Sequence, residues 1–94
     1  MDRKRMEDAQ KTLSWAIESL KLSIRCMVIN YKDNKYKAQF FTWGNRLVRG
    51  VGFSIPEEWI RDTNPMKNDI RDELRSLLRE LEEEARKREE VKTD

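Results

Sequence analysis

Two short turn sequences divide the middle of this chain, and they restrict what it can fold into. From Leu22 to Tyr31 the sequence is apolar and β-branched without helical spacing, and turn sequences follow at 32–35 and at Gly44–Asn45. Asp and Asn tolerate left-handed backbone geometry in the first turn, and Gly followed by Asn predicts a two-residue type II′ hairpin turn in the second. Turns this short join neighbouring antiparallel strands. We therefore expect a three-stranded meander whose strands cover residues 22–31, 36–43 and 46–54.

The segments on either side of this meander have helical patterns. From Met6 to Leu20, apolar residues recur at steps of three and four, which predicts an amphipathic helix. After the meander, Pro56 followed by two acids predicts a short helical turn, and Asn64–Pro65 predicts the start of a helix that continues to about Val91. The expected fold class is α+β: an N-terminal helix, an antiparallel meander of three to four strands, and a broken C-terminal helix. We divide the chain into an α/β-meander domain, 1–63, and a C-terminal amphipathic helix, 64–94.

A short apolar stripe marks the C-terminal helix. Its members recur at the a and d spacing of a heptad pattern, and the stripe ends where the next heptad positions are Glu84 and Arg88. A stripe of this length suits either contact between subunits or packing on the sheet. We predict that this stripe forms a short coiled-coil contact that joins the subunits of a homodimer or homotetramer, through Ile70, Leu74, Leu77, Leu78 and Leu81. Beyond it, acid-before-base pairs four residues apart, such as Glu82–Arg86, support an exposed helical end.

Charge is distributed unevenly along the chain, although the net charge is only +2. Residues 1–55 carry 11 Lys and Arg against 5 Asp and Glu, whereas residues 56–94 carry 9 against 13. Within residues 21–55 the ratio is seven to one, and Asp33 is the single acid. The basic excess therefore lies on the predicted strands, among aromatic residues, which is typical of a surface that binds a polyanion.

The predicted turns fix a register in which Trp43 lies opposite Arg46. One face of the sheet then combines cations with rings: it carries Lys37, Gln39, Phe41, Trp43, Arg46, Val48, Gly50 and Gly52, extended by Cys26, Val28, Asn30 and Lys32. The other face is the better core: it carries Met27, Ile29, Tyr31, Tyr36, Ala38, Phe40, Leu47, Val51 and Phe53. Arg49 is the misfit among these core residues, and a β-bulge at Gly50 would move it to the first face.

The chain lacks most of the residues that catalysis and metal binding require. It has no His, the commonest general base and metal ligand, and its one Cys therefore has no His partner. No glycine-rich phosphate loop precedes a helix, and the carboxylates of the last helix stand beside Arg and Lys as ion pairs. We predict no enzyme activity, no catalytic residue, no metal, no cofactor and no small-molecule substrate.

Other sequence features suggest where the protein works. The lone Cys26 fits a reducing compartment, and the charged N-terminus does not resemble a signal peptide. The longest uncharged run, Ala38–Asn45, is far too short to span a bilayer. We expect a cytoplasmic protein with no membrane partner, and the abundance of Arg, Lys and Glu suggests a thermophilic source.

These observations predict non-catalytic binding of single-stranded DNA or RNA with little sequence preference, because rings stack on bases while cations contact phosphates. We assign Lys35, Lys37, Phe41, Trp43, Arg46 and Arg49 to this site. Each also has a structural explanation, since a ring can pack at the edge of a sheet and a strand cation can simply be solvated. Two alternatives stay open: a small dimeric adaptor for protein–protein contact, and a transcription regulator that binds duplex DNA.

Two family resemblances agree with this prediction. The segment GVGFSIPEEWI, Gly50–Ile60, resembles the strand-to-helix corner of the positive-cofactor-four family of single-stranded DNA-binding proteins. There a glycine-containing strand, Ser, an apolar residue and an acid-rich helix start with an aromatic residue follow in the same order. This likeness covers roughly Tyr36–Ile60, and the N-terminal helix and long C-terminal helix depart from it. The overall order of elements is more similar to the archaeal ThermoDBP-type single-stranded DNA-binding proteins and their shorter relatives. That resemblance implies an aromatic and basic cleft, and dimers or tetramers joined through the last helix.

Overall fold

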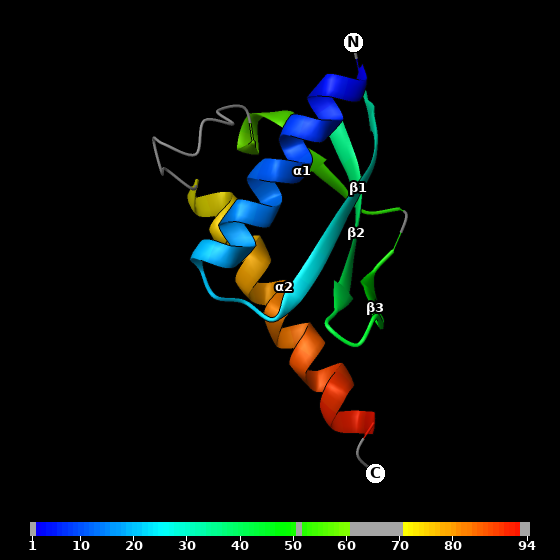
Figure 1. Cartoon of the computed structure of the whole chain (residues 1–94), viewed down its shortest axis with the longest axis vertical. Helices are drawn as coiled ribbons and strands as arrows, with labels where there is room; N and C mark the ends of the chain where they lie inside the picture. Colours follow the sequence, from blue (N-terminus) through cyan, green and yellow to red (C-terminus); the bar gives the residue numbers. More distant parts are fainter. Residues whose placement is uncertain (1, 51, 61–70, 93–94) are drawn as a thin grey trace.

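The computed structural model describes residues 2–50, 52–60 and 71–92 of the chain (Figure 1). In order, its elements are helix α1 (Asp2–Ser19), strands β1 (Ile24–Lys32), β2 (Lys35–Thr42), β3 (Leu47–Arg49) and β4 (Ser54–Pro56), the 3-10 helix η1 (Glu57–Trp59) and helix α2 (Asp72–Lys92). A helix, an antiparallel sheet and a second helix confirm the predicted α+β fold. The helix start predicted at Asn64–Pro65, and Ile70 of the apolar stripe, lie outside the described residues.

The sheet is built around β2. Strand β1 pairs with one edge of β2, whereas β3 and β4 both pair with the other edge, at opposite ends of β2. The predicted continuous third strand over 46–54 is therefore wrong. The chain turns between the two short strands, where the Phe53 N–H donates to the Gly50 carbonyl at 3.1 Å.

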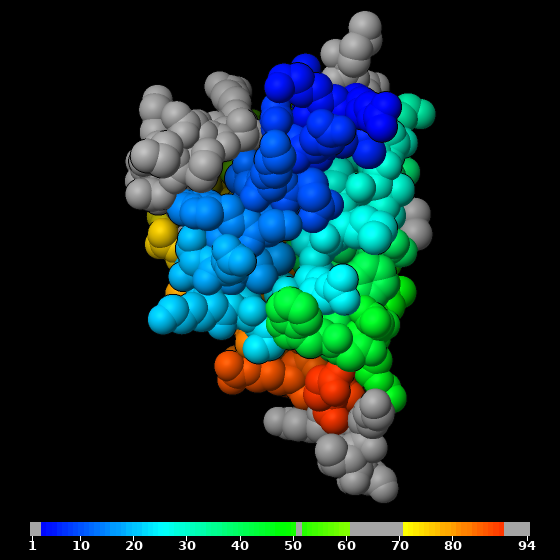
Figure 2. All heavy atoms as spheres, viewed as in Figure 1, coloured from blue at the N-terminus to red at the C-terminus, as the bar shows by residue number. Residues whose placement is uncertain are grey.

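Both helices pack on one face of the sheet (Figure 1). In Figure 2, α1 (blue) lies directly against the cyan and green strands, and the orange-red end of α2 emerges beyond them. The core between helices and sheet is a single cluster of buried side chains: Ala9, Leu13, Ala16, Ile17, Ile24, Tyr36, Ala38, Phe40, Val48, Ile55, Ile60, Leu74, Leu78, Leu81 and Ala85. The predicted core residues of β2 are thus confirmed.

The apolar stripe of α2 belongs to this core. Leu74, Leu78 and Leu81 are at most 1% exposed, and they pack with residues of α1 and of the sheet. Their assignment to a subunit contact is therefore corrected to a role inside one chain, because the chain's own sheet already buries them. Leu77 is partly buried against the same cluster.

The two hairpin turns differ from each other in type. Asp33 and Asn34 have φ angles of 55° and 61°, as in a two-residue type I′ turn. The second turn is a three-residue loop, Trp43–Asn45, in which the Asn45 N–H donates to the Thr42 carbonyl at 2.9 Å and Asn45 itself has a φ of 68°. The predicted type II′ turn is wrong, because Asn45 and not Gly44 takes the left-handed conformation.

A β-bulge in β1 reverses the predicted orientation of the first strand. Next to the turn Tyr31 pairs with Tyr36, in the expected register, but further on Val28 pairs with Ala38, so that Ile29 is an extra residue. A single inserted residue moves every preceding side chain to the opposite face. Cys26 and Val28 therefore pack toward the helices, while the predicted core residues Met27 and Ile29 are 55% and 37% exposed.

A second β-bulge, in β3, also reverses the predicted orientation of side chains. Leu47 pairs with Phe41 and Arg49 pairs with Phe40, so Val48 is the extra residue. Val48 is buried at 4% exposure, whereas Leu47 is 46% exposed, which reverses their predicted places. The three-residue loop before β3 is the source of this shift, and the bulge restores the register for Arg49.

Helix α1 also covers the outer edge of β1. The Gln10 side-chain amide donates to the Cys26 carbonyl at 2.9 Å and accepts from the Val28 N–H at 2.7 Å. These backbone groups face away from β2 and would otherwise offer pairing sites to another strand. Gln10 therefore blocks edge-to-edge association along this part of the sheet.

Candidate nucleic-acid interface

The exposed side chains of the strands lie on the face of the sheet opposite the helices. We call this surface the open sheet face; it consists of Arg25, Met27, Ile29, Asn30, Lys32, Lys35, Lys37, Gln39, Phe41 and Leu47. No helix among residues 2–50, 52–60 and 71–92 packs against it (Figure 1). Side chains of β2 alternate strictly here, because Tyr36, Ala38, Phe40 and Thr42 turn toward the helices.

Cations crowd one end of the open sheet face. Lys32 lies directly opposite Lys35 across the first hairpin, and Lys37 lies two residues further along β2. Like charges placed directly opposite each other destabilise a strand pair. Asp33 in the turn is the single acid of the hairpin. A polyanion lying across these lysines would relieve the repulsion, so this end is suited to phosphate contacts.

Trp43 stands at the other end of the face. It lies in the loop after β2 and is 63% exposed. The Arg25 guanidinium lies over its ring, 5.6 Å from the centroid, and Arg25 Nη1 donates to Asn45 Oδ1 at 2.9 Å. These contacts hold an aromatic ring and a cation side by side at the surface, the combination that stacking on a base next to a phosphate requires.

Five of the six predicted binding residues lie together on this surface or in the loop beside it. Lys35 and Lys37 are exposed on β2, Phe41 is half-buried beside Leu47, and Trp43 and Arg46 are exposed in the second hairpin.

Arg49, the sixth, does not join them. It faces α2, where its Nη2 contacts Glu84 Oε2 at 2.6 Å and Glu80 Oε2 at 3.3 Å. Its guanidinium also lies 5.2 Å from the Phe53 ring centroid. The hydrogen bond to Glu84 is the main reason that the pKa of Arg49 is raised above its ordinary value. The predicted phosphate role of Arg49 is corrected: its charge is already neutralised by two glutamates, and it fastens β3 to α2.

Several residues of the open sheet face differ from the sequence-based prediction. Arg25 is absent from the predicted site, and Met27, Ile29 and Leu47 are predicted core residues, because the predicted register contains neither bulge. The only signal for them is the mixed pattern of β1, which is apolar on both faces. Together with Phe41 they add an apolar surface to the cationic one.

Little else among the described residues offers chemistry. Burial raises the pKa of the Cys26 thiol to about 12, so the thiol stays protonated and is a poor nucleophile. Residues 2–50, 52–60 and 71–92 hold no group of three Cys, Asp or Glu placed to bind a metal ion. The two helices described are too polar or too short to cross a membrane.

No protein-family model, curated protein or solved structure matches this chain. The resemblance to ThermoDBP-type and positive-cofactor-four proteins therefore stays a prediction. The geometry of the open sheet face alone then points to a function.

Proposed function

We propose that this protein binds single-stranded DNA or RNA along the open sheet face, without catalysis. The observation that carries the proposal is the composition of one exposed surface: Arg25, Lys32, Lys35 and Lys37 share it with Phe41, and exposed Trp43 adjoins it. Unstacked bases can lie on these rings while cations on either side neutralise the backbone. A duplex fits less well, because its bases are already stacked on one another and offer no free faces to the rings.

The number of cations limits how strongly salt should weaken binding. For single strands, the logarithm of the association constant falls by about 0.7 per neutralised phosphate as the logarithm of salt concentration rises. Arg25, Lys32, Lys35, Lys37 and Arg46 are exposed. If all five contact phosphates, the slope reaches about −3.5. A slope close to zero would show that these cations do not meet the ligand.

Fluorescence anisotropy with labelled oligo-dT and oligo-U tests the proposal. Trp43→Ala should weaken binding by about 1–3 kcal/mol with the fold intact, since one stacking ring is lost. Lys37→Gln should reduce the salt slope by roughly 0.7. Arg49→Gln is the matched control: it removes the same charge from the opposite, helix-facing side of the sheet, so it should lower thermal stability and leave the salt slope unchanged.

Three results would count against the proposal. Wild-type protein that fails to bind either oligomer at micromolar concentration would reject it. Equal losses in slope for Lys37→Gln and Arg49→Gln would show that binding follows net charge and not this surface. Tighter binding to duplex competitor would favour the duplex-binding alternative.

A protein partner is the second candidate, and the exposed aliphatic residues favour it. Met27 and Leu47 are 55% and 46% exposed, and with Ile29 they form apolar surface of the kind found at protein contacts. This candidate predicts that Leu47→Ser abolishes partner binding while Lys37→Gln leaves it intact. In either case we place the protein in the cytoplasm, because a reducing compartment keeps the Cys26 thiol free.

A further inference from the structure

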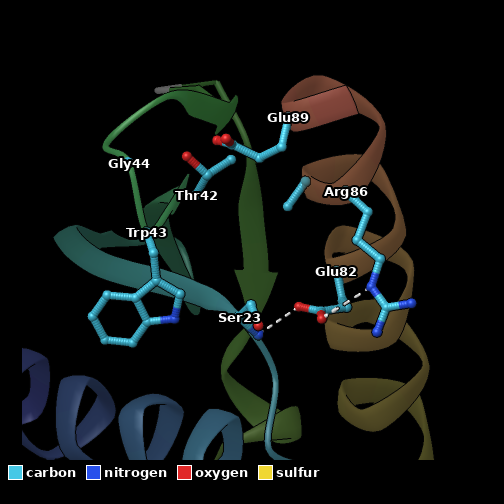
Figure 3. A pocket seen from close by; sticks show the side chains of 8 residues that line it. Ser23, Thr42, Trp43, Gly44, Glu82, Arg86 and Glu89 are labelled. Atoms are coloured by element: carbon cyan, nitrogen blue, oxygen red, sulfur yellow. Dashed lines mark hydrogen bonds and ion pairs between the residues drawn. The ribbon is translucent and has the colours of Figure 1, made fainter. Parts of the chain in front are cut away.

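A hollow of about 490 Å³ opens beside Trp43, between the loop after β2 and the C-terminal half of α2 (Figure 3). Trp43 and Gly44 line it from the loop, and Glu82, Arg86 and Glu89 line it from α2. Trp43 therefore takes part in two surfaces: Arg25 of the open sheet face lies over its ring, and the ring also lines the hollow. Trp43 is therefore the residue through which the open sheet face and the hollow, which lies on the helix-facing side of the sheet, adjoin each other.

The two carboxylates that line the hollow differ in exposure and in how many partners they have. Glu82 is 6% exposed, accepts the Ser23 N–H at 2.6 Å and lies 3.4 Å from Arg86 Nε. These contacts fix it in place and leave it little capacity for a ligand. Glu89 is exposed and has no ion pair or hydrogen bond with the described residues. Its carboxylate has both oxygens available, and an ionised carboxylate only accepts hydrogen bonds.

The charges around the hollow select the kind of group that fits. Glu82 and Arg86 pair with each other, so Glu89 is the charged lining residue that can accept from a ligand. An anionic group inside the hollow would be repelled by Glu89. A flat neutral ring with N–H donors avoids this repulsion and supplies donors to the carboxylate, provided that its phosphate stays outside, near Arg25. A nucleobase has these properties, and Trp43 offers it a ring at the entrance.

Among the bases, guanine matches a carboxylate best. Its N1–H and N2–H donors lie side by side, so two parallel hydrogen bonds to the oxygens of Glu89 are possible, as in other bidentate pairs. Thymine has one N–H between two carbonyl oxygens, which a carboxylate would repel. Resting on the proposed function, we propose that this hollow is a guanine-selective subsite at one end of the single-strand path, with Glu89 as its acceptor.

The test compares a labelled thymidine decamer with the same decamer carrying one guanine. Wild-type protein should bind the guanine-containing oligomer roughly 5-fold tighter or more, the range expected of one good bidentate contact. Inosine in the same position lacks the N2 amine and should lose most of this gain. Glu89→Gln should abolish the preference, because an amide offers one acceptor in place of two.

Two further variants keep the test decisive. Glu83→Gln, six residues before Glu89 on the exposed surface of α2, changes the net charge equally and should keep the preference. Gly44→Leu should abolish it by filling the hollow, since a Cβ on Gly44 would already lie 3.6 Å from Glu89 Oε2. Gly44 has no positive φ, so a side chain there does not strain the backbone.

The outcomes separate this proposal from the one on which it rests. Equal binding of both decamers to wild-type protein would overturn the guanine subsite and leave single-strand binding intact. A preference that survives Gly44→Leu or Glu89→Gln would also overturn it, because the preference would then arise elsewhere. If neither decamer binds, both proposals are rejected together.

Discussion

Replacing Val48 and Leu47 in turn by alanine tests the register that creates the open sheet face. The two residues are neighbours in one short strand, yet Val48 is 4% exposed and Leu47 is 46% exposed. Val48→Ala removes two buried methyl groups, worth about 1.6 kcal/mol of transfer free energy. A cavity term adds to this, so we expect a total loss of roughly 2–3 kcal/mol. Leu47→Ala should cost less than about 1 kcal/mol, because half of that side chain already contacts water.

Chemical and thermal denaturation followed by circular dichroism measure both values. In a domain of this size, 1 kcal/mol corresponds to about 4–8 °C in Tm, so Val48→Ala should lower Tm by roughly 10 °C or more. Leu47→Ala serves as its control, since it removes a larger side chain from the same strand. If Leu47→Ala proved the more destabilising, the bulge at Val48 would be absent, and the aliphatic part of the open sheet face would be buried.

Three further predictions concern the parts that frame the sheet. Lys21, in the turn two residues beyond the end of α1, has a φ of 57°, so Lys21→Gly should raise the free energy of unfolding by about 0.5–1 kcal/mol. A lower stability in urea would contradict this. Gln10→Ala leaves the Val28 N–H without its partner and should cost roughly 1–3 kcal/mol, with increased self-association in sedimentation because the edge of β1 is exposed; unchanged stability and association would refute the role of Gln10. The pKa of Cys26 rises from 9.0 to about 12 on folding, so the folded state favours the protonated thiol. The contribution of this thiol to the free energy of unfolding is therefore fully present below pH 9, and it is lost as the pH rises toward 12. Cys26→Ala should lack that part of the decline, and rapid alkylation of the native thiol at pH 8 would contradict the raised pKa.

The helices and the central strand could be predicted from the sequence because their periodic patterns are unambiguous. Ala9, Leu13 and Ala16 follow helical spacing and all reach the core. Tyr36 and Phe40 alternate with polar residues on β2, so only one face of that strand can be buried. In these segments one orientation buries far more apolar surface than any other.

The outer strands could not be oriented in the same way. In β1 the run from Cys26 to Ile29 is apolar at every position, so a shift by one residue exchanges one apolar face for another. Hydrophobic patterning then gives no preference, and the bulge at Ile29 decides which side chains become exposed. Arg25 reaches the open sheet face for this reason alone.

The tertiary contacts of individual side chains were the hardest feature to predict from the sequence. In the sequence Arg49 resembles a surface cation. In the structure it forms ion pairs with Glu80 and Glu84, which lie one helical turn apart on α2. That contact depends on how α2 crosses β3, which no local pattern specifies. The leucine stripe of α2 posed the same problem, since packing on the sheet and contact between subunits require the same spacing.

A backbone amide NMR titration with oligo-dT tests the central claim most directly. Binding along the open sheet face predicts progressive shifts at Met27, Lys37 and Leu47, while Leu13 in α1 stays unperturbed. The same shifts should diminish as salt is raised, because phosphate contacts weaken. Shifts confined to the helices, or no shifts at saturating oligonucleotide, would contradict the account.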